Sequence, residues 1–291
     1  MNHKAGFVNI IGKPNVGKST LMNELVGEKL SIITPKKQTT RHRILGIVNE
    51  DDYQIIFSDT PGYLKPGYKL QESMMKFVES ALLDADIFLY ITAADEQDED
   101  DEIIEKLKET DVPVIVVINK IDLSDQKKIE TLYDSWQKKI PNAKVLPIAA
   151  LHKFNVDTLF KLILELLPES PPYYPKDELT DKTMRFFVSE IIREKIFTNY
   201  QQEVPYSTEV IVDAYKEEEK IIRIMAYVFV IRESQKAIIL GHKGNAIKKA
   251  ATQARVDIED FVGKKVFLEI RVKVSKDWRD DPMKLKRFGY E

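Results

Sequence analysis

The sequence has no cysteine, no long apolar run and no repeated segment. Without cysteine the chain can form neither disulfides nor thiolate zinc sites, and it has no thiol nucleophile. The longest apolar run, residues 221–231, contains Arg223 and is shorter than the roughly 20 residues that cross a bilayer. The first apolar segment begins soon after Met1, which leaves no room for a signal peptide. We therefore expect a cytoplasmic protein.

Histidines are also few. His3, His42, His152 and His242 share no metal-ligand spacing; we predict that the first three lie on the surface and that His242 contacts RNA. What is present is an ordinary globular composition, with 43% hydrophobic and 31% charged residues. A chain of 291 residues with this composition is long enough for two domains.

The charge is distributed unevenly along the chain. Residues 232–291 contain 15 Lys and Arg against 9 Asp and Glu, a net charge of +6, whereas the whole chain carries −3. A basic C-terminal part on an acidic chain indicates a polyanionic partner for that part. The acidic excess gathers at residues 95–102, where we predict a solvated helix start rather than a metal site.

A glycine loop, GKPNVGKS at residues 12–19, stands between the apolar run 7–11 and a helical segment. Its glycines let backbone N–H groups approach an anion, and the following helix adds the positive end of its dipole. In this pattern Lys18 reaches the β- and γ-phosphates, and the Ser19 hydroxyl ligates Mg2+. The alternative is a glycine-containing turn that binds nothing, which the Lys-Ser pair and the flanking segments disfavour.

A second motif, DTPG at residues 59–62, follows the apolar run 53–57. Asp59 would hold Mg2+ from outside its direct ligands, and the backbone of Gly62 would sense the γ-phosphate. Asp-x-x-Gly by itself is a common turn. Its position after the glycine loop, at the end of an apolar strand, indicates the second half of a nucleotide site.

A third motif, NKID at residues 119–122, follows the buried run 114–118. The Asp122 carboxylate can accept hydrogen bonds from N1–H and the 2-amino group of guanine, whereas adenine has neither donor. Asn119 would bind the base and connect neighbouring loops, and the Lys120 stem would pack along the base plane. This motif favours GTP and opposes an ATP-using P-loop enzyme.

The turn at residues 149–151 reads AAL, where guanine-nucleotide domains usually have SAK or SAL. The backbone N–H of Ala150 can still contact guanine O6. Because residue 149 is alanine, any support from a serine hydroxyl is absent.

A proline-rich segment, PESPPYYP at residues 168–175, marks a domain boundary. We predict a nucleotide domain at 1–170, a linker at 171–180 and a second domain with a C-terminal tail at 181–291. Residues 31–43 are predicted to form a mobile loop. The predicted helices are 74–85, 102–109, 155–167, 185–197, 235–240 and 245–261, and the predicted strands are 7–11, 44–48, 53–57, 87–91, 114–118, 145–148, 207–215, 221–231 and 266–274.

The two later helices of the second domain are joined by GHKG at residues 241–244. A G-x-x-G link with a basic residue lets the backbone of single-stranded nucleic acid pass close to the protein. The spacing alone is equally typical of an inert turn between helices. The regional charge and the basic helix that follows, with Lys248, Lys249 and Arg255, favour nucleic acid.

Taken together, these motifs resemble the Era family, bacterial GTPases with a C-terminal KH domain. The segment QTTRH at 38–42 and the tail segments DWR at 277–279 and FGY at 288–290 are also similar to that family. The resemblance implies an α/β fold: a P-loop GTPase domain with a mostly parallel sheet, followed by an α+β type II KH domain. It implies binding to the 3′ end of 16S rRNA and a role in small-subunit assembly.

The resemblance also implies roles for single residues. Thr40, or Thr39 as the second choice, would close over Mg2+ and the γ-phosphate. Residue 63 is Tyr63 rather than a water-orienting Gln, so hydrolysis relies on other groups, and Asn15 resembles an asparagine that coordinates K+. We expect slow turnover, stimulated by K+ or a partner.

The predicted catalytic residues are Asn15, Lys18, Thr40 and Gly62, and the predicted Mg2+ residues are Ser19, Thr40 and Asp59. The predicted GTP site comprises Gly12, Asn15, Val16, Gly17, Lys18, Ser19, Thr20, Asp59, Gly62, Asn119, Lys120, Asp122, Ala149, Ala150 and Leu151. The predicted RNA site comprises Gly241, His242, Lys243, Gly244, Lys248, Lys249, Arg255, Trp278 and Arg279.

The expected partners are GTP and GDP, 16S rRNA and the small ribosomal subunit, with peripheral contact at the inner face of the cell membrane as a further expectation. We expect a monomer that does not bind DNA. The alternative hypothesis is a GTPase scaffold or membrane-associated switch, whose C-terminal module binds protein or anionic lipid.

Overall fold

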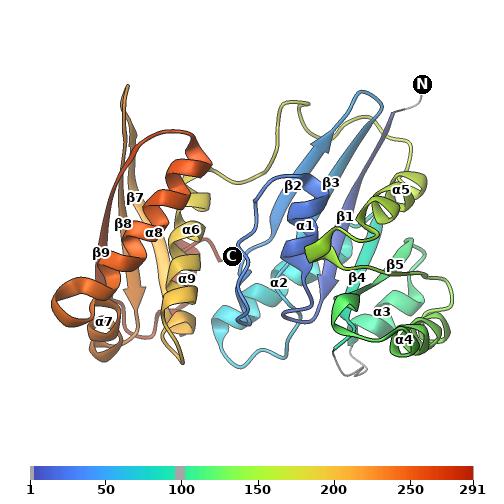
Figure 1. The fold of residues 1–291 in the computed structure, drawn as a ribbon, viewed down its shortest axis with the longest axis horizontal. Coiled ribbons are helices and arrows are strands. Elements are labelled where there is room, and N and C mark those ends of the chain that lie inside the picture. Colours follow the sequence, from blue (N-terminus) through green and yellow to red (C-terminus); the bar gives the residue numbers. More distant parts are fainter. Residues whose placement is uncertain (1–2, 96–101, 291) are drawn as a thin grey trace. The chain divides into compact units, whose positions relative to one another are not determined.

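The computed structural model describes residues 3–95 and 102–290, which form two compact units (Figure 1). The first unit contains the chain up to Ser31, Thr40–Lys65 and Met74–Asp181. The second contains Ile32–Thr39, Pro66–Ser73 and the chain from Lys182 onward. Most of the acidic run predicted as a helix start at 95–102 lies outside the described residues.

The described part of the first unit is built on a six-stranded sheet with the order β2-β3-β1-β4-β5-β6. Strand β2 runs antiparallel to β3, and the other neighbouring strands pair in parallel. The strands are β1 (Lys4–Gly12), β2 (Ile44–Asn49), β3 (Tyr53–Asp59), β4 (Ile87–Ala93), β5 (Val114–Asn119) and β6 (Lys144–Pro147). Because the parallel strands share one direction, the loops after β1, β3 and β5 meet at the same edge.

Helices connect these strands, and Figure 1 shows α1 and α5 on one face of the sheet. Their bounds are α1 (Lys18–Val26), α2 (Lys69–Leu83), α3 (Glu102–Glu109), α4 (Gln126–Lys139) and α5 (Val156–Leu166), with 3-10 turns at Ile121–Leu123 and Ala150–His152. The sequence interpretation missed α4, whose surface is mostly charged. Its one buried residue, Trp136, packs on Tyr90 with ring centroids 5.3 Å apart.

The proline-rich segment predicted as a linker at 171–180 lies along β2 and β3 within the first unit. The Ile47 N–H donates to Leu179 O at 2.8 Å, and the Leu45 N–H donates to Asp181 Oδ1 at 2.9 Å. Gln54 accepts from the Tyr173 N–H at 2.7 Å. An edge strand presents unpaired backbone groups, and this segment satisfies part of that edge.

The second unit has the element order α-β-β-α-α-β, followed by a short helix. Its elements are α6 (Met184–Asn199), β7 (Glu209–Glu217), β8 (Ile222–Val230), α7 (Glu233–Leu240), α8 (Asn245–Val262), β9 (Val266–Val274) and α9 (Pro282–Arg287), with 3-10 turns at Pro205–Ser207, His242–Gly244 and Trp278–Asp280. Strand β8 pairs antiparallel with β7 and parallel with β9. Alternate residues of the three strands form one core with α6, α7 and α8.

Residues 32–39, which form no helix or strand, belong to this second unit. The Lys36 ammonium donates to the backbone carbonyls of Phe197 and Tyr200, at the C-terminal end of α6. These are carbonyls that a helix end leaves without an intrahelical partner. Burial lowers the pKa of Lys36. A segment predicted as a mobile loop is therefore anchored on α6.

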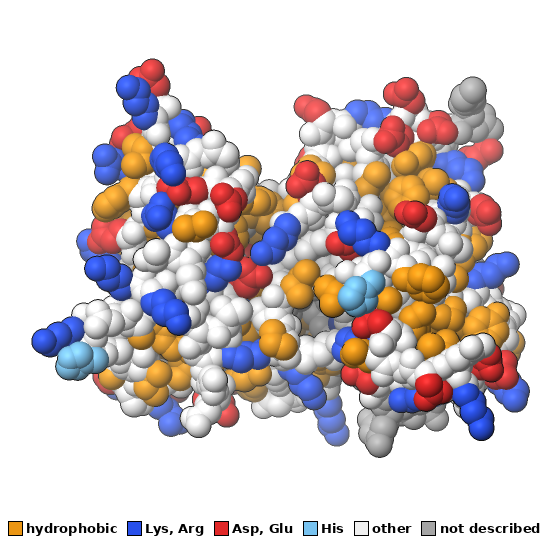
Figure 2. All heavy atoms as spheres, viewed as in Figure 1, with side chains coloured by type: hydrophobic (Ala, Val, Ile, Leu, Met, Phe, Trp, Pro, Cys, Tyr) orange, Lys and Arg blue, Asp and Glu red, His pale blue; other side chains and the backbone are white. Residues whose placement is uncertain are grey.

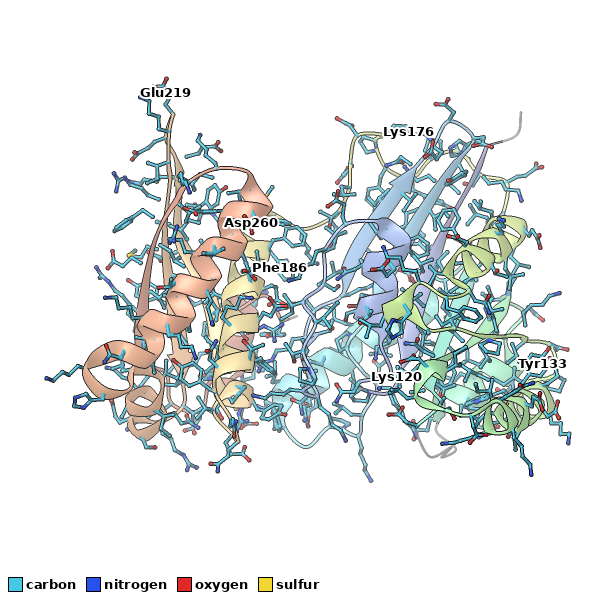
Figure 3. The ribbon with its side chains drawn as sticks, viewed as in Figure 1. Lys120, Tyr133, Lys176, Phe186, Glu219 and Asp260 are labelled. Carbon is cyan, nitrogen blue, oxygen red and sulfur yellow. The ribbon has the colours of Figure 1, made fainter. Side chains whose placement is uncertain are left out.

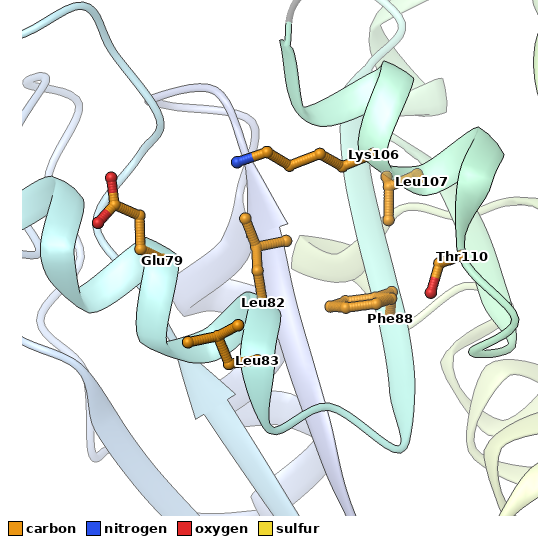
Figure 4. Close-up of a pocket in the computed structure, with 7 residues that line it drawn as sticks. All are labelled: Glu79, Leu82, Leu83, Phe88, Lys106, Leu107 and Thr110. Atoms are coloured by element: carbon orange, nitrogen blue, oxygen red, sulfur yellow. The ribbon is translucent and has the colours of Figure 1, made fainter.

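A cavity of about 350 Å3 lies between α2, the start of β4 and α3 (Figure 4). Its walls are Leu82, Leu83, Phe88 and Leu107, and Lys106 extends over it. The cavity lies near the start of β4, whereas the predicted nucleotide loops follow the ends of β1, β3 and β5.

In the described ranges, none of the helices combines the length and apolar character needed to cross a membrane.

Candidate nucleotide and RNA sites

The glycine loop joins β1 to α1 and contains three residues with positive φ angles, which glycine and, less readily, asparagine can adopt. Gly12, Asn15 and Gly17 have φ values of 149°, 67° and 99°. A Cβ atom on Gly17 would lie 2.3 Å from Asn119 Nδ2, so glycine is also required for packing. Lys18, the first residue of α1, folds back over the loop and donates to Gly12 O at 3.1 Å and Lys13 O at 2.8 Å. Its ammonium thus stands where the phosphates of a nucleotide are expected.

Three side-chain oxygens converge beside this loop. Ser19 Oγ donates to Asp59 Oδ2 at 2.7 Å and lies 2.9 Å from Thr40 Oγ1, which is 3.4 Å from the same carboxylate oxygen. Asp59 is fully buried, and its Oδ1 has no hydrogen-bond partner within the described residues. Burial raises the pKa of the Asp59 carboxyl, which the Ser19 hydroxyl and the Lys18 ammonium oppose.

This oxygen cluster fits a bound Mg2+. Mg2+ takes oxygen ligands, keeps several waters and is held by few protein groups together with substrate phosphates. Ser19 and Thr40 supply hydroxyls, and the buried Asp59 carboxylate supplies the negative charge that a cation would balance. Across residues 3–95 and 102–290 there is no cluster of three or more His, Cys, Asp or Glu that could hold a metal ion.

The geometry also distinguishes Thr40 from Thr39. The Thr39 hydroxyl donates to Lys36 O at 2.7 Å and lies 2.6 Å from Thr34 Oγ1. These contacts are all with residues of its own loop. Thr40 alone of the two faces the Ser19 and Asp59 oxygens, so it is the better placed of the two predicted residues.

The DTPG segment packs directly on the glycine loop. Thr60 Oγ1 donates to Ile10 O at 2.8 Å, and the Tyr63 N–H donates to Gly12 O at 3.0 Å. A Cβ atom on Gly62 would lie 2.6 Å from the backbone N and Cα of Pro14. Real Cβ contacts are never so short, so any side chain at residue 62 would push the two loops apart.

Asn119 connects the predicted base site to the glycine loop. It is only 3% exposed; its Nδ2 donates to Val16 O at 2.9 Å, and its Oδ1 accepts from the Ala150 N–H at 3.0 Å. The predicted link between neighbouring loops is therefore present in the structure. The binding roles of Val16, Thr20, Ala149 and Leu151 remain predictions.

Asp122 and Lys120 lie in the turn after β5, where Figure 3 labels Lys120. Lys120 Nζ lies 3.7 Å from Asp95 Oδ1, and Asp122 Oδ2 lies 3.6 Å from His152 Nε2. The Asp122 side chain is 28% exposed, so it can meet a ligand from solvent. His152 was predicted as a surface residue, and it is exposed, but its place beside Asp122 was missed. The only signal was that it follows Leu151 in the predicted guanine turn.

The predicted RNA loop joins α7 to α8. Gly241, Lys243 and Gly244 have φ values of 68°, 50° and 77°, and a Cβ atom on Gly241 would lie 2.6 Å from Ala246 Cβ. His242 and Lys243 are exposed at the tip of the loop. An exposed cation between tightly turned glycines is what a nucleic-acid backbone clamp requires.

Helix α8 extends the basic surface of this loop. Lys248 and Lys249 are exposed in its first turns, whereas Arg255 is paired with Glu259 at 2.8 Å. Figure 2 shows several Lys and Arg side chains on the face of the second unit that carries α8. The two lysines are thus better placed for RNA than Arg255.

Trp278 is a correction to the predicted RNA site. It is 0% exposed, its Nε1–H donates to Ser207 O at 3.1 Å, and its ring packs on Phe288 with centroids 5.5 Å apart. A buried ring cannot stack on a base, so Trp278 holds the C-terminal tail against the unit. Arg279 is half-buried, and its guanidinium lies 4.7 Å from the centre of the Tyr68 ring.

Comparisons with known proteins match a GTPase family in the first part of the chain and a KH family in the second. The family described as "50S ribosome-binding GTPase" matches residues 7–120, and the KH domain family matches residues 203–279. The rice chloroplastic GTPase ERA-like is 50% identical over 99% of this chain and 70% of its own length. GTPase Era of Thermoanaerobacter sp. (strain X514) is 45% identical over 100% of this chain and 97% of its own length.

Two solved structures match nearly the whole chain. An Era in complex with MgGDPNP and nucleotides 1506–1542 of 16S ribosomal RNA is 42% identical, with a TM-score of 0.95 over 99% of both chains. An Aquifex aeolicus Era variant bound to GDP.AlF4- is 41% identical, with a TM-score of 0.93 over 99% of both chains.

The fold and the nucleotide loops define a P-loop GTPase joined to a type II KH domain. Within that class, the chain belongs to the Era family of GTPases.

Proposed function

We propose that this chain is a GTP-hydrolysing switch that binds the 3′ end of 16S rRNA and assists assembly of the small ribosomal subunit. Membership of the Era family supports GTP hydrolysis, and the related Era in complex with nucleotides 1506–1542 of 16S rRNA supports binding to that RNA. The KH domain, with its exposed GHKG loop at residues 241–244, supplies the RNA-binding module.

The observation that carries the proposal is the path of the chain around the nucleotide site. Residues 32–39, directly before Thr40, and residues 66–73, shortly after Gly62, belong to the second unit. In that unit the Arg193 guanidinium, 1% exposed and paired with Glu190, donates to Thr39 O at 2.5 Å. A movement of Thr40 or Gly62 on loss of the γ-phosphate would thus be passed to the segments that the RNA-binding unit holds.

Hydrolysis proceeds by attack of water on the γ-phosphate, in line with the leaving oxygen. Lys18 and the backbone N–H groups of the glycine loop would bind the phosphates, and Gly62 would contact the γ-phosphate. Ser19, Thr40 and Asp59 would hold Mg2+, which would supply positive charge to the phosphates. Tyr63 stands where other GTPases use Gln, so no side chain next to Gly62 orients the water by an amide.

A potassium ion coordinated by Asn15 would supply further positive charge near the phosphates. Asn15 lies in the glycine loop with a left-handed backbone, at a φ of 67°. Single-turnover hydrolysis should therefore be faster in K+ than in Na+ at equal ionic strength. Equal rates in the two buffers would remove Asn15 from the mechanism.

Guanine selection is assigned to Asp122. The variant Asp122→Asn should lose affinity for guanine nucleotides and gain affinity for xanthine nucleotides, because its amide can donate to the 2-oxygen of xanthine. Tight ATP binding by the unaltered protein would contradict the assignment and favour the alternative ATP enzyme.

RNA binding distinguishes this function from a scaffold or membrane-associated switch. Full-length protein loaded with a GTP analogue is titrated with single-stranded RNA and with anionic vesicles, using Lys243→Glu as a loop variant. We expect RNA binding that this variant weakens at least tenfold by reversing the loop's charge. Binding to vesicles alone would favour the rival function. Cytoplasmic location, a monomeric state and contact with the inner membrane face remain part of the proposal.

We also retain the predicted division of function along the sequence. Residues 1–170 would bind and hydrolyse GTP, and residues 181–291 would bind RNA. Because 171–181 pack on the first unit, the segment at 171–180 would serve as part of the GTPase domain surface as well as a connection.

A further inference from the structure

The three-stranded sheet of the second unit has one face that α6, α7 and α8 do not cover; at one end of it Phe288, directly after α9, packs on Phe229 with ring centroids 5.1 Å apart. Strand residues such as Val228 and Val272 form the core with α6, α7 and α8, so their strand neighbours point to the opposite side. The residues that carry the argument, here called the open face, are Arg223, Tyr227, Phe229, Phe267, Arg271 and Lys273. The RNA loop belongs to the helical side, between α7 and α8.

The parallel register of β8 and β9 sets an aromatic residue beside a cation in three of the four rows on this face; the remaining row pairs Met225 with Glu269. Arg223 pairs with Phe267, Tyr227 with Arg271, and Phe229 with Lys273. The aromatic residue changes strand between the first row and the next two, so rings and cations are interleaved over the face. A basic patch offers only positive charge to a ligand, whereas this arrangement also offers rings on which bases can stack.

Distances show that these side chains contact one another and keep exposed surface. The Arg223 guanidinium lies 5.5 Å from the Phe267 ring centre, and Lys273 Nζ lies 3.5 Å from that of Tyr227. The Tyr227 and Phe229 centroids are 6.0 Å apart. Phe267, the second residue of the edge strand β9, is 50% exposed, a high value for a phenylalanine.

The open face is hollowed at one end. A cavity of about 150 Å3 is lined by Tyr227, Phe229 and Phe288 together with the cations Lys273 and Arg287. Asp213 and Ile211 also line it. A ring-walled hollow with cations at its edge can hold a flat group of the ligand and the negative charge attached to it.

A purely structural role would explain less. Cross-strand pairs of this kind stabilise a sheet by about 0.2–1 kcal/mol each, and one such pair needs no other function. Acidic neighbours are present: Glu218 pairs with Arg223 at 3.0 Å, and Glu269 pairs with Arg271 at 2.7 Å. Both pairs are exposed, so they are weak and an anionic ligand can replace the carboxylates.

We propose that the open face is a second RNA-binding surface, which stacks unpaired bases on Tyr227, Phe229 and Phe267 and binds phosphates through Arg271 and Lys273. This rests on the proposed RNA-binding function and extends it, because a G-x-x-G loop holds only about four nucleotides. Interleaved rings and cations fit single-stranded RNA, whose bases stack on aromatics while its backbone meets cations.

The test uses full-length protein loaded with Mg2+ and a non-hydrolysable GTP analogue. One probe is an RNA of about six nucleotides, enough to fill the loop clamp. The other is an RNA equivalent to nucleotides 1506–1542 in the related complex. The open-face variants are Phe267→Leu and Arg271→Ala, the loop variant is Lys243→Glu, and the charge control is Lys265→Ala, whose side chain is 79% exposed.

Phe267→Leu should bind the long RNA about 5- to 100-fold more weakly, since one base stacked on an aromatic accounts for a change of that size. Arg271→Ala should also weaken this binding, because it removes a phosphate contact. Both variants should bind the short RNA within twofold of the unaltered protein, and Lys265→Ala should change neither. Ultraviolet crosslinking should attach the long RNA to the peptides of β8 or β9. Phe267→Leu should leave the second unit folded, because the replaced ring is half-exposed.

Unchanged binding of the long RNA by both open-face variants would overturn the second surface while leaving the loop site intact. If the unaltered protein binds neither RNA, the proposed function itself fails. Loss of binding to anionic vesicles in these variants, with long-RNA binding unchanged, would show that the face binds lipid and would also overturn the proposal.

Discussion

Replacing Asn119 with alanine should destabilise the first unit even without nucleotide. The change removes two hydrogen bonds and leaves the Val16 carbonyl and the Ala150 N–H without that partner in a region where Asn119 is only 3% exposed. An unsatisfied buried group costs about 1–3 kcal/mol. Because water can enter the vacated space, we take the lower half of that range, about 2–4 kcal/mol for the two groups.

The assay is thermal unfolding of the nucleotide-free protein, followed by titration with GDP. In a domain of this size ~1 kcal/mol shifts Tm by about 2–4 °C, so Asn119→Ala should lower Tm by roughly 4–16 °C. GDP affinity should fall about 10- to 100-fold, as expected for 1.4–2.7 kcal/mol. Asn49→Ala is the control, because Asn49 also makes two hydrogen bonds but is half-exposed on β2. A Tm loss no larger than that of the control would refute the bridging role.

Three other substitutions test separate parts of the account. Gly62→Ala places a Cβ 2.6 Å from Pro14, and relieving this clash by separating the two loops costs about 1–3 kcal/mol. If that cost is added to the activation barrier, single-turnover hydrolysis should slow roughly 5- to 150-fold. GDP affinity should stay within threefold. Lys36→Met removes the ammonium from the α6 carbonyls and should destabilise the second unit by about 1.5–3 kcal/mol in chemical denaturation, and an unchanged midpoint would contradict the anchoring. Trp278→Phe should lower the Tm of the second unit yet leave RNA affinity at 10 °C unchanged; an RNA defect in still-folded protein would restore Trp278 to the RNA site.

The nucleotide loops could be predicted because each follows an apolar run. The runs before Gly12, Asp59 and Asn119 are strands of one sheet, and parallel strands bring their carboxyl ends to one edge. The predicted RNA loop at residues 241–244 could also be recognised, because all its residues are adjacent in sequence.

Contacts between distant segments could not be predicted. Nothing local shows that Lys36 reaches the end of α6, or that the segment before Asp181 covers β2. Trp278 was predicted as an RNA contact together with the tail segment DWR, whereas its burial depends on contacts with Phe288 and Ser207, which lie outside that segment. The open face depends on the register of two strands that α7 and α8 separate in the sequence.

The most direct test of the central claim compares RNA affinity in the two nucleotide states. Full-length protein is loaded with Mg2+ and either GDP or a non-hydrolysable GTP analogue, and the Kd for RNA equivalent to nucleotides 1506–1542 of the related complex is measured at one salt concentration. The account predicts that the two Kd values differ at least fivefold, the lower end of typical coupling between sites. Equal Kd values would contradict a GTP-controlled RNA switch.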